Sequence, residues 1–274
     1  MVMRILKNVC REPIAVSSRS MSGGSGTLAY VENGVLAVAS GLVPSDVDSS
    51  LLRGATIAIT GGFRPSEDSL GVTLDPQVHG GIVAQSFDAT TGRLVLSGTA
   101  TLAQYQAALA AVRYANSSDA PGITPRVVEV SVVDAEGATS QVATRAVSVS
   151  AVNDAPVVDI DGSGPLAAGA PGQVLFVRGL SAGGVALAPS ATLSDVDSTV
   201  LRGLTVTIAA PQAGDSLGFS AGARAALEGA GIAVPLAAVD AGGRLVLSVG
   251  GTASVGTYQS VLRGLLFDST AQTE

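Results

Sequence analysis

The chain has 274 residues, enough for two domains that each bury a core of their own. Its formal net charge is −7 and its sequence pI is about 4.7, a balance that repels the phosphates of nucleic acid and suits cations. Aromatic residues make up only 3% of the chain and 34 residues are glycine, which favours many short strands joined by turns over helices.

Residues 1–27 are predicted to form a flexible N-terminal segment, because they end in a run of Ser and Gly at residues 20–26. The start of the chain carries basic residues, but residues 10–13 interrupt it before an apolar stretch forms, so it does not read as a secretory signal. The single cysteine, Cys10, lies outside both predicted domains, so neither can carry an internal disulfide. No run of about 18 apolar residues is present, so no membrane span is expected.

The first predicted domain spans residues 28–152. Residues 55–59 alternate Ile with small or polar residues, which predicts a half-buried strand. Apolar residues recur at spacings of three and four within residues 101–112, which predicts a short helix. Two strands, residues 126–134 and 139–152, are predicted to close the domain around a turn.

The second predicted domain spans residues 153–274 and repeats the first. The motif Asp46-Val47-Asp48-Ser49 recurs as Asp195-Val196-Asp197-Ser198, 149 residues later. Two further blocks recur in the same order: residues 93–97 as 244–248, and Tyr105 with Gln106 as Tyr258 with Gln259. Three matched blocks in one order indicate a tandem array.

The second domain is predicted to be incomplete. At the local offset of the repeat Glu274 corresponds to Pro121, so residues 122–152 have no counterpart and both closing strands are missing. A sandwich without them leaves an open edge and an uncovered apolar face. Either the sequence is a fragment, which we prefer, or another chain completes the domain.

Several motifs together resemble a known family: Asp-x-Asp-Ser, Phe87-Asp88-x-x-Thr-Gly92-x-Leu94, Val-x-Asp134 and Val152-Asn153-Asp154-Ala155-Pro156. In combination they resemble the cadherin-like tandem repeats of large bacterial surface and exported adhesin-type proteins, over residues 28–274. The resemblance implies an all-β fold of tandem Greek-key β-sandwiches, cadherin-like or immunoglobulin-like, the second one truncated at its C-terminus. It also implies calcium ions at the joints between successive repeats.

Calcium takes about six to eight oxygen ligands, which loops at facing ends of two rigid domains can supply. Carried over from the resemblance, the candidate metal ligands are the acids and the amide that match the family's motifs: Glu32, Asp88, Asp134, Glu136, Asn153, Asp154, Asp195 and Asp197. Pro156 locks its own φ and restricts Ala155, which would fix the direction of the chain at this joint.

Turn formation is the alternative interpretation of the same residues. An Asp-x-Asp pair beside Ser caps loop amides in ordinary turns, and residues 153–156 can be a turn alone. Two positions also depart from the cadherin pattern. Thr90 stands where true cadherins have an acid, and Arg178 takes the place of Glu32 in the second domain. We therefore expect at most one complete calcium site.

We therefore expect a calcium-rigidified, extracellular structural and adhesive repeat array that is a fragment of a larger adhesin. Its expected partners are neighbouring repeats of a longer chain and a cell-surface or matrix ligand, without nucleic acid. A cell-surface or extracellular location is expected although no signal peptide is visible. The alternative is a carbohydrate- or matrix-binding module of an exported protein, which the scarcity of aromatics disfavours. An enzyme is not expected, because no nucleophile–base pair, metal triad or phosphate loop is visible.

Overall fold

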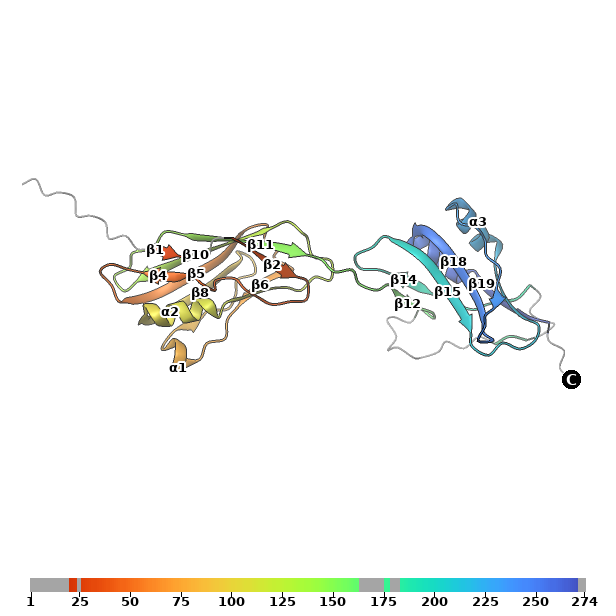
Figure 1. The fold of residues 1–274 in the computed structure, drawn as a ribbon, viewed down its shortest axis with the longest axis horizontal. Coiled ribbons are helices and arrows are strands. Elements are labelled where there is room, and N and C mark those ends of the chain that lie inside the picture. The colour runs from red at the N-terminus through yellow and green to blue at the C-terminus, as the bar shows by residue number, and fades with distance from the viewer. Residues whose placement is uncertain (1–19, 24–25, 163–174, 178–182, 271–274) are drawn as a thin grey trace, which may run out of the picture. The chain divides into compact units, whose positions relative to one another are not determined.

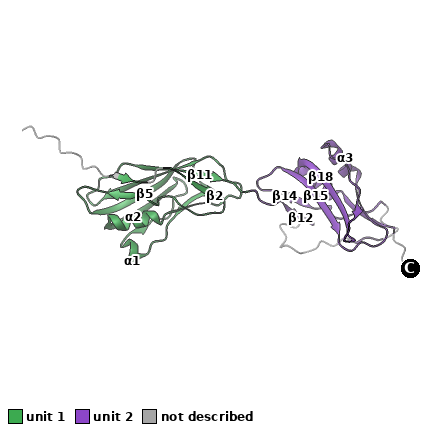
Figure 2. Ribbon diagram, viewed as in Figure 1, with its two compact units in different colours: residues 1–152 green, residues 153–274 purple. Residues whose placement is uncertain are grey.

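The structure, a computed structural model, describes residues 20–23, 26–162, 175–177 and 183–270; Cys10 and Arg178 lie outside these ranges. The chain divides into two compact units, residues 1–152 (unit 1) and residues 153–274 (unit 2) (Figures 1 and 2). Strands predominate in both units, which confirms the predicted all-β sandwich class. None of the helices within the described ranges is long and apolar enough to cross a membrane.

Unit 1 contains one large sheet with the strand order β2-β11-β10-β5-β8-β7. Its members are β2 (Thr27–Val31), β5 (Leu51–Gly61), β7 (Val83–Ala84), β8 (Arg93–Thr101), β10 (Arg126–Asp134) and β11 (Ala143–Ser150). Every neighbouring pair is antiparallel except β2 and β11, which run parallel. Because β2 and β11 point the same way, the chain leaves both strands at the same end of the sheet.

A second sheet and a short ladder complete unit 1. The second sheet has the order β3-β9-β6, formed by β3 (Leu36–Ala37), β9 (Arg113–Asn116) and β6 (Asp68–Gly71). The ladder pairs β1 (Ser20–Ser22) with β4 (Val43–Ser45). Strand β1 thus lies within the stretch predicted to be a flexible linker, because its backbone finds a partner 23 residues further along the chain in β4.

Helix α2 (Leu102–Ala110) lies within the helix predicted over residues 101–112, and α1 (Pro76–His79) is a single short turn. A capping box starts α2: the Gln104 backbone N–H donates to the Thr101 hydroxyl at 3.2 Å, and the Gln104 side chain accepts from the Thr101 N–H at 3.0 Å. Both bonds satisfy amides that have no partner inside the helix.

Replacing Thr101 by Ala is expected to lower the stability of unit 1 by about 1 kcal/mol, because the cap loses its acceptor. Urea unfolding of the full chain would measure this loss. Thr101→Ser keeps the hydroxyl and is the matched control, expected to stay within a few tenths of a kcal/mol. An equal loss in both variants would contradict the role of the cap.

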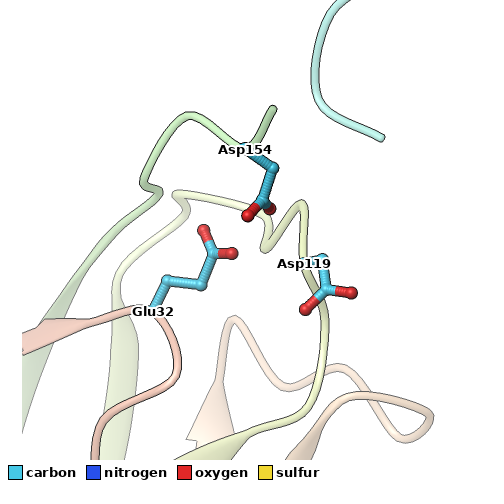
Figure 3. A group of neighbouring side chains, drawn as sticks. All are labelled: Glu32, Asp119 and Asp154. Carbon is cyan, nitrogen blue, oxygen red and sulfur yellow. The ribbon is translucent and has the colours of Figure 1, made fainter. Parts of the chain in front are cut away.

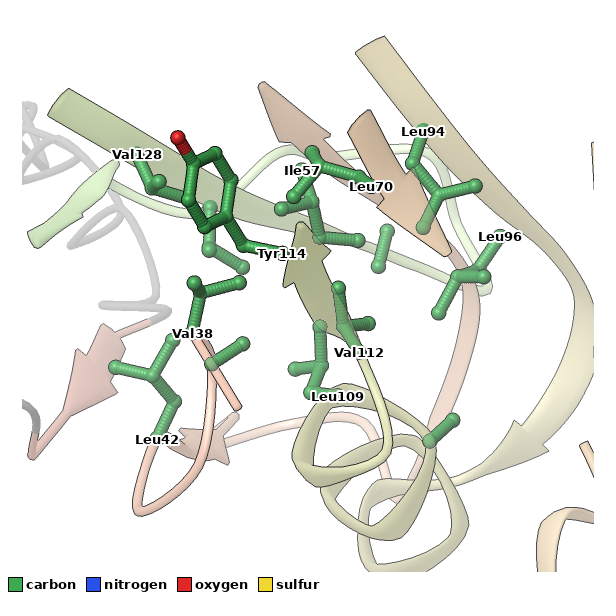
Figure 4. Close-up of a cluster of buried hydrophobic side chains, with 14 of the residues drawn as sticks. Val38, Leu42, Ile57, Leu70, Leu94, Leu96, Leu109, Val112, Tyr114 and Val128 are labelled. Carbon is green, nitrogen blue, oxygen red and sulfur yellow. The ribbon is translucent and has the colours of Figure 1, made fainter. Parts of the chain in front are cut away.

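The core of unit 1 fills the space between the two sheets and α2 (Figure 4). Figure 4 shows Ile57 and Val128 from the large sheet, Tyr114 from β9 and Leu109 from α2 converging on one interior, and each of these side chains is fully buried at 0% exposure. Tyr105 of α2 is buried as well, and its hydroxyl donates to the Gly98 carbonyl at 2.7 Å, which satisfies the polar end of the ring. Burial raises its pKa to about 12.

A buried polar network joins the two sheets of unit 1. Asp68, the first residue of β6, receives hydrogen bonds from Arg126 at 3.0 Å and from Tyr114 and Asn116 at 2.7 Å each. The Asp68 and Arg126 side chains are both fully buried. Burial alone would raise the pKa of Asp68, but the hydrogen bonds from Arg126, Tyr114 and Asn116 outweigh it and hold that pKa below its ordinary value. Arg126 also donates to the Thr124 carbonyl at 2.6 Å, so its charge is well satisfied.

Unit 2 repeats the arrangement with fewer described strands. One sheet has the order β15-β18-β17 and another the order β13-β19-β16, beside a ladder of β12 and β14. These strands are β12 (Val157–Asp159), β13 (Val185–Ala186), β14 (Thr192–Ser194), β15 (Val200–Ile208), β16 (Asp215–Phe219), β17 (Ala238–Val239), β18 (Leu245–Ser254) and β19 (Leu265–Ser269). The helices are α3 (Ala221–Gly229) and α4 (Val255–Arg263).

Strand pairing shows which elements of the two units correspond. In unit 1 the run Asp68-Ser69-Leu70-Gly71 forms β6, and Leu70 pairs with Tyr114. In unit 2 the same run, beginning at Asp215, opens β16, and Leu217 pairs with Phe267. By the same comparison β15 corresponds to β5 and β18 to β8. Counterparts of β10 and β11 are absent from the described residues of unit 2.

Candidate metal centre

Three acidic side chains gather around the segment that follows β11. They are Glu32, Asp119 and Asp154, and one carboxylate oxygen of each lies within 4.8 Å of the other two (Figure 3). Glu32 is buried, Asp154 is half-buried and Asp119 is exposed. The group therefore combines a buried, a half-buried and an exposed carboxylate.

Glu32 is placed by the parallel pairing of β2 with β11. It follows β2 directly, and its backbone N–H donates to the Ser150 carbonyl at 3.0 Å. Its Oε2 accepts from the Val152 backbone N–H at 2.8 Å, which holds the side chain against the segment that follows β11. Its other oxygen, Oε1, is buried and has no hydrogen-bond partner among the described residues. A buried carboxylate oxygen without a donor costs free energy unless a cation neutralises it.

Asp119 reaches the group through the loop that follows β9. The Asn116 backbone N–H donates to the Tyr30 hydroxyl at 2.9 Å, and that hydroxyl donates to the Asn116 carbonyl at 3.1 Å. The Asn116 side chain then accepts from the Ser118 N–H at 2.9 Å, which turns the chain toward Asp119. These bonds anchor the start of the loop to Tyr30, two residues before Glu32.

The spacing of the three carboxylates suits a calcium ion. Oxygens that bind one calcium at about 2.3–2.6 Å lie at most about 5 Å apart across the ion. The three oxygens lie within 4.8 Å of one another, close enough to bind one ion. Three carboxylates can supply between three and about six oxygens, depending on how many bind through both. Three like charges this close also repel one another, so a cation would stabilise the arrangement.

Asp154 and Asp197, two of the predicted ligands, meet directly. The Asp154 backbone N–H donates to Asp197 Oδ2 at 2.9 Å, and the Asn153 side chain donates to the Asp154 carbonyl at 2.7 Å. Asp195 instead caps its own turn, since its Oδ1 accepts from the backbone N–H groups of Asp197 and Ser198 at 3.3 and 2.9 Å. This is the turn chemistry of the alternative interpretation.

Asp134 and Glu136 lie at the opposite end of unit 1 from Glu32. Strand β10 runs antiparallel to β11, so it begins at Arg126 near the end of β11 and reaches Asp134 about 27 Å further on, eight steps of roughly 3.4 Å. There Asp134 Oδ1 accepts from the Gly137 and Ala138 N–H groups at 2.6 and 2.7 Å. The structure therefore does not bring Asp134 or the exposed Glu136 to the acidic group.

Asp88 precedes β8, and two other strands separate β8 from β11 in the large sheet. Neighbouring strands lie about 4.8 Å apart, so Asp88 is remote from the acidic group even though it lies at the same end. Its carboxylate accepts from the Thr91 hydroxyl at 2.6 Å and from the Thr90 N–H at 2.8 Å. Those hydrogen bonds, the one from the Thr91 side chain first, hold the pKa of Asp88 below its ordinary value.

The structure thus unites Glu32 and Asp154 from the predicted set and adds Asp119, which sequence reasoning missed. Asp119 is the only acid between β9 and β10, and this was the signal available in the sequence. This isolated acid could be assigned to the site only once the structure showed that the end of β9 is hydrogen-bonded to Tyr30 of β2. Whether the other predicted residues bind a metal stays a prediction.

Comparison with known proteins gives limited help. No protein-family model matches the chain. The chain is similar to halomucin of Haloquadratum walsbyi, with 33% identity over 107 residues. Those residues make up 39% of this chain but only 1% of halomucin, so the chain matches a very small part of that relative. Neither comparison identifies a cadherin-like family, so that resemblance also stays a prediction.

Proposed function

We propose that the chain is a repeat segment of a large surface-associated protein, and that it binds calcium through Glu32, Asp119 and Asp154. The similarity to halomucin, a large surface protein, supports the first part. The observation that carries the second part is the buried Glu32 Oε1, which has no hydrogen-bond partner among the described residues and lies beside two further carboxylates.

Calcium would act on the segment that follows β11. Glu32 already holds this segment through the Val152 N–H, and Asp154 follows two residues later. An ion shared by Glu32, Asp119 and Asp154 would tie the same segment to the β9 loop as well. The backbone of residues 152–154 would then lose freedom of movement, which is the stiffening expected of a structural repeat. The role we propose is structural rather than enzymatic.

We also propose that the repeat segment contributes to adhesion at a cell surface. The predicted cell-surface or matrix ligand is supported by the similarity to halomucin alone.

Calorimetric titration of the full chain with CaCl2 tests the calcium site. Glu32→Gln keeps the size of the side chain and removes its charge, and we expect it to weaken binding at least tenfold, about 1.4 kcal/mol. Glu136→Gln makes the same chemical change at the opposite end of unit 1 and should leave the affinity unchanged. Equal weakening by both variants, or no heat of binding in the unmodified chain, would rule out this site.

A further inference from the structure

The apolar residues that strand β15 of unit 2 turns toward the core are less covered than those of its counterpart β5. Ile57 of β5 is 0% exposed and Ile59 is 2% exposed. The corresponding residues of β15, Val206 and Ile208, are both partly exposed. In unit 1 β5 lies between β10 and β8, but in the described part of unit 2 β15 pairs with β18 alone. Among the described residues, no strand pairs with the other edge of β15, and an edge without a partner leaves backbone groups free to bind another strand.

Strand β18, the partner of β15, does not show this difference. On the paired side, Leu245 and Leu247 of β18 are 5% and 1% exposed, close to the 2% and 0% of Leu94 and Leu96 in β8. The face of β18 that turns toward the core is therefore as well covered as that of β8.

A cavity of about 410 Å³ lies along this side. Its walls are mostly apolar and come from four parts of unit 2: Val158 and Ile160, Leu187 and Ala188, residues 204–207, and Leu262 with Leu265. Successive side chains of a strand point to opposite faces, so four consecutive residues can line one cavity only where it runs along the strand edge. The cavity is thus continuous with the free edge of β15.

Unit 1 shows what fills the equivalent space. Val38, Ala39, Leu109 and Val112 correspond to four of the lining residues, and each is 0% exposed in unit 1. They belong to one core cluster with Val128, Val130 and Val132, which β10 presents at every second position. The cavity of unit 2 therefore matches the space that β10 side chains occupy in unit 1.

Unit 2 also carries a carboxylate at the position where Asp68 pairs with the first residue of β10 in unit 1. Asp215 corresponds to Asp68, and both carboxylates accept one backbone N–H in the same way, from Gln212 at 2.7 Å and from Arg64 at 2.8 Å. Asp68 also pairs with Arg126, the first residue of β10. No described residue forms an ion pair with Asp215, which is half-buried.

We propose that unit 2 is a strand acceptor: the free edge of β15, the adjoining cavity and Asp215 bind a β-hairpin of the β10–β11 type. Its first strand would run antiparallel to β15, with an arginine at the first position for Asp215 and branched apolar residues at the third, fifth and seventh for the cavity. Strand β15 of a second copy could also pair with this edge, but we expect it to bind more weakly, because it would leave the cavity empty.

Unit 1 supplies the hairpin sequence for a direct test. A copy of residues 122–152 is joined after Glu274 of the full chain, and amide hydrogen exchange is measured in the original and the extended proteins. We expect the β15 amides that face the free edge to exchange at least tenfold more slowly in the extended protein. The β15 amides already bonded to β18 are the internal reference. No slowing at the free edge would overturn the proposal.

Two variants of the extended protein distinguish specific docking of the hairpin from non-specific hydrophobic association. In the first, the added copy carries Val128 exchanged with Glu129 and Val130 with Ser131, which keeps its composition but turns the valines away from the cavity. Protection should then be lost, and protection equal to that of the native hairpin would overturn the proposal. In the second, Asp215→Asn should weaken the protection of the β15 amides. Adding Arg126→Met in the added copy to this variant should cause no further loss, because the arginine has already lost its partner.

The oligomeric state of the original chain completes the test. Light scattering should show a monomer whose β15 edge exchanges rapidly. A dimer in which that edge is already protected would identify a second copy as the occupant and overturn the hairpin proposal.

Discussion

Unit 1 is expected to unfold about 5–10 °C higher in calcium at a hundred times its Kd than in EDTA. Binding to the folded state alone stabilises it by about 2.7 kcal/mol at that ratio. For a unit of this size each kcal/mol raises the melting temperature by roughly 2–4 °C. Differential scanning calorimetry of the full chain measures the shift, and identical traces in the two conditions would contradict calcium binding.

The effect of Asp119→Asn on the melting temperature of unit 1 should have opposite signs in EDTA and in saturating calcium. Asp119 is exposed and lies beside two other carboxylates, so in EDTA its charge only adds repulsion. Removing it should leave unit 1 equally stable or slightly more stable without calcium. In saturating calcium the same variant should melt below the unmodified chain, because a ligand is lost. A variant that is destabilised equally in both conditions would mean that Asp119 has a purely structural role.

Asp68→Asn is expected to destabilise unit 1 by about 3–5 kcal/mol, the usual result of removing one partner of a buried ion pair. The Arg126 side chain is fully buried and would keep its charge without the carboxylate that now pairs with it at 3.0 Å. The hydrogen bonds from Tyr114 and Asn116 would weaken as well. Urea unfolding measures the loss.

Asp215→Asn is the matched control within the same chain. Asp215 begins the same Asp-Ser-Leu-Gly run in unit 2 and accepts a comparable backbone bond from Gln212, but no described residue forms an ion pair with it. We expect its replacement to change the stability of unit 2 by about 1 kcal/mol or less. Similar losses at both positions would mean that the ion pair with Arg126 is not the cause.

The pH dependence of unit 1 should follow the same carboxylate. Because the folded-state pKa of Asp68 lies below its ordinary value, its contribution is complete above the unfolded pKa of about 3.9 and is lost as the pH falls through the folded value. The stability difference between the unmodified chain and Asp68→Asn should therefore be constant near neutral pH and shrink below pH ~4. A difference that stayed constant down to pH ~2 would exclude ionised Asp68 as its source.

Local pattern was enough to predict most elements of the fold. Alternation identified β5 and β10, and spacings of three and four identified α2, because each signal depends only on neighbouring residues. The internal repeat likewise predicted a tandem all-β arrangement. Strand β1 escaped this reasoning, since three residues of Ser and Met form a strand only when β4 is there to pair with them.

The sequence by itself predicted several strands, the repeat and, among eight candidate ligands, Glu32 and Asp154, because motifs and periodicity are carried by residues close together in the chain. Only the tertiary structure decided which acids share a site. Asp134 matches its motif as well as Glu32 does, yet the antiparallel course of β10 carries it to the far end of the sheet. Asp119 matches no motif, yet the hydrogen bonds of Tyr30 to Asn116 bring its loop beside Glu32. The position of a carboxylate on a loop follows from strand order and direction, which are set by pairing between residues distant in the chain.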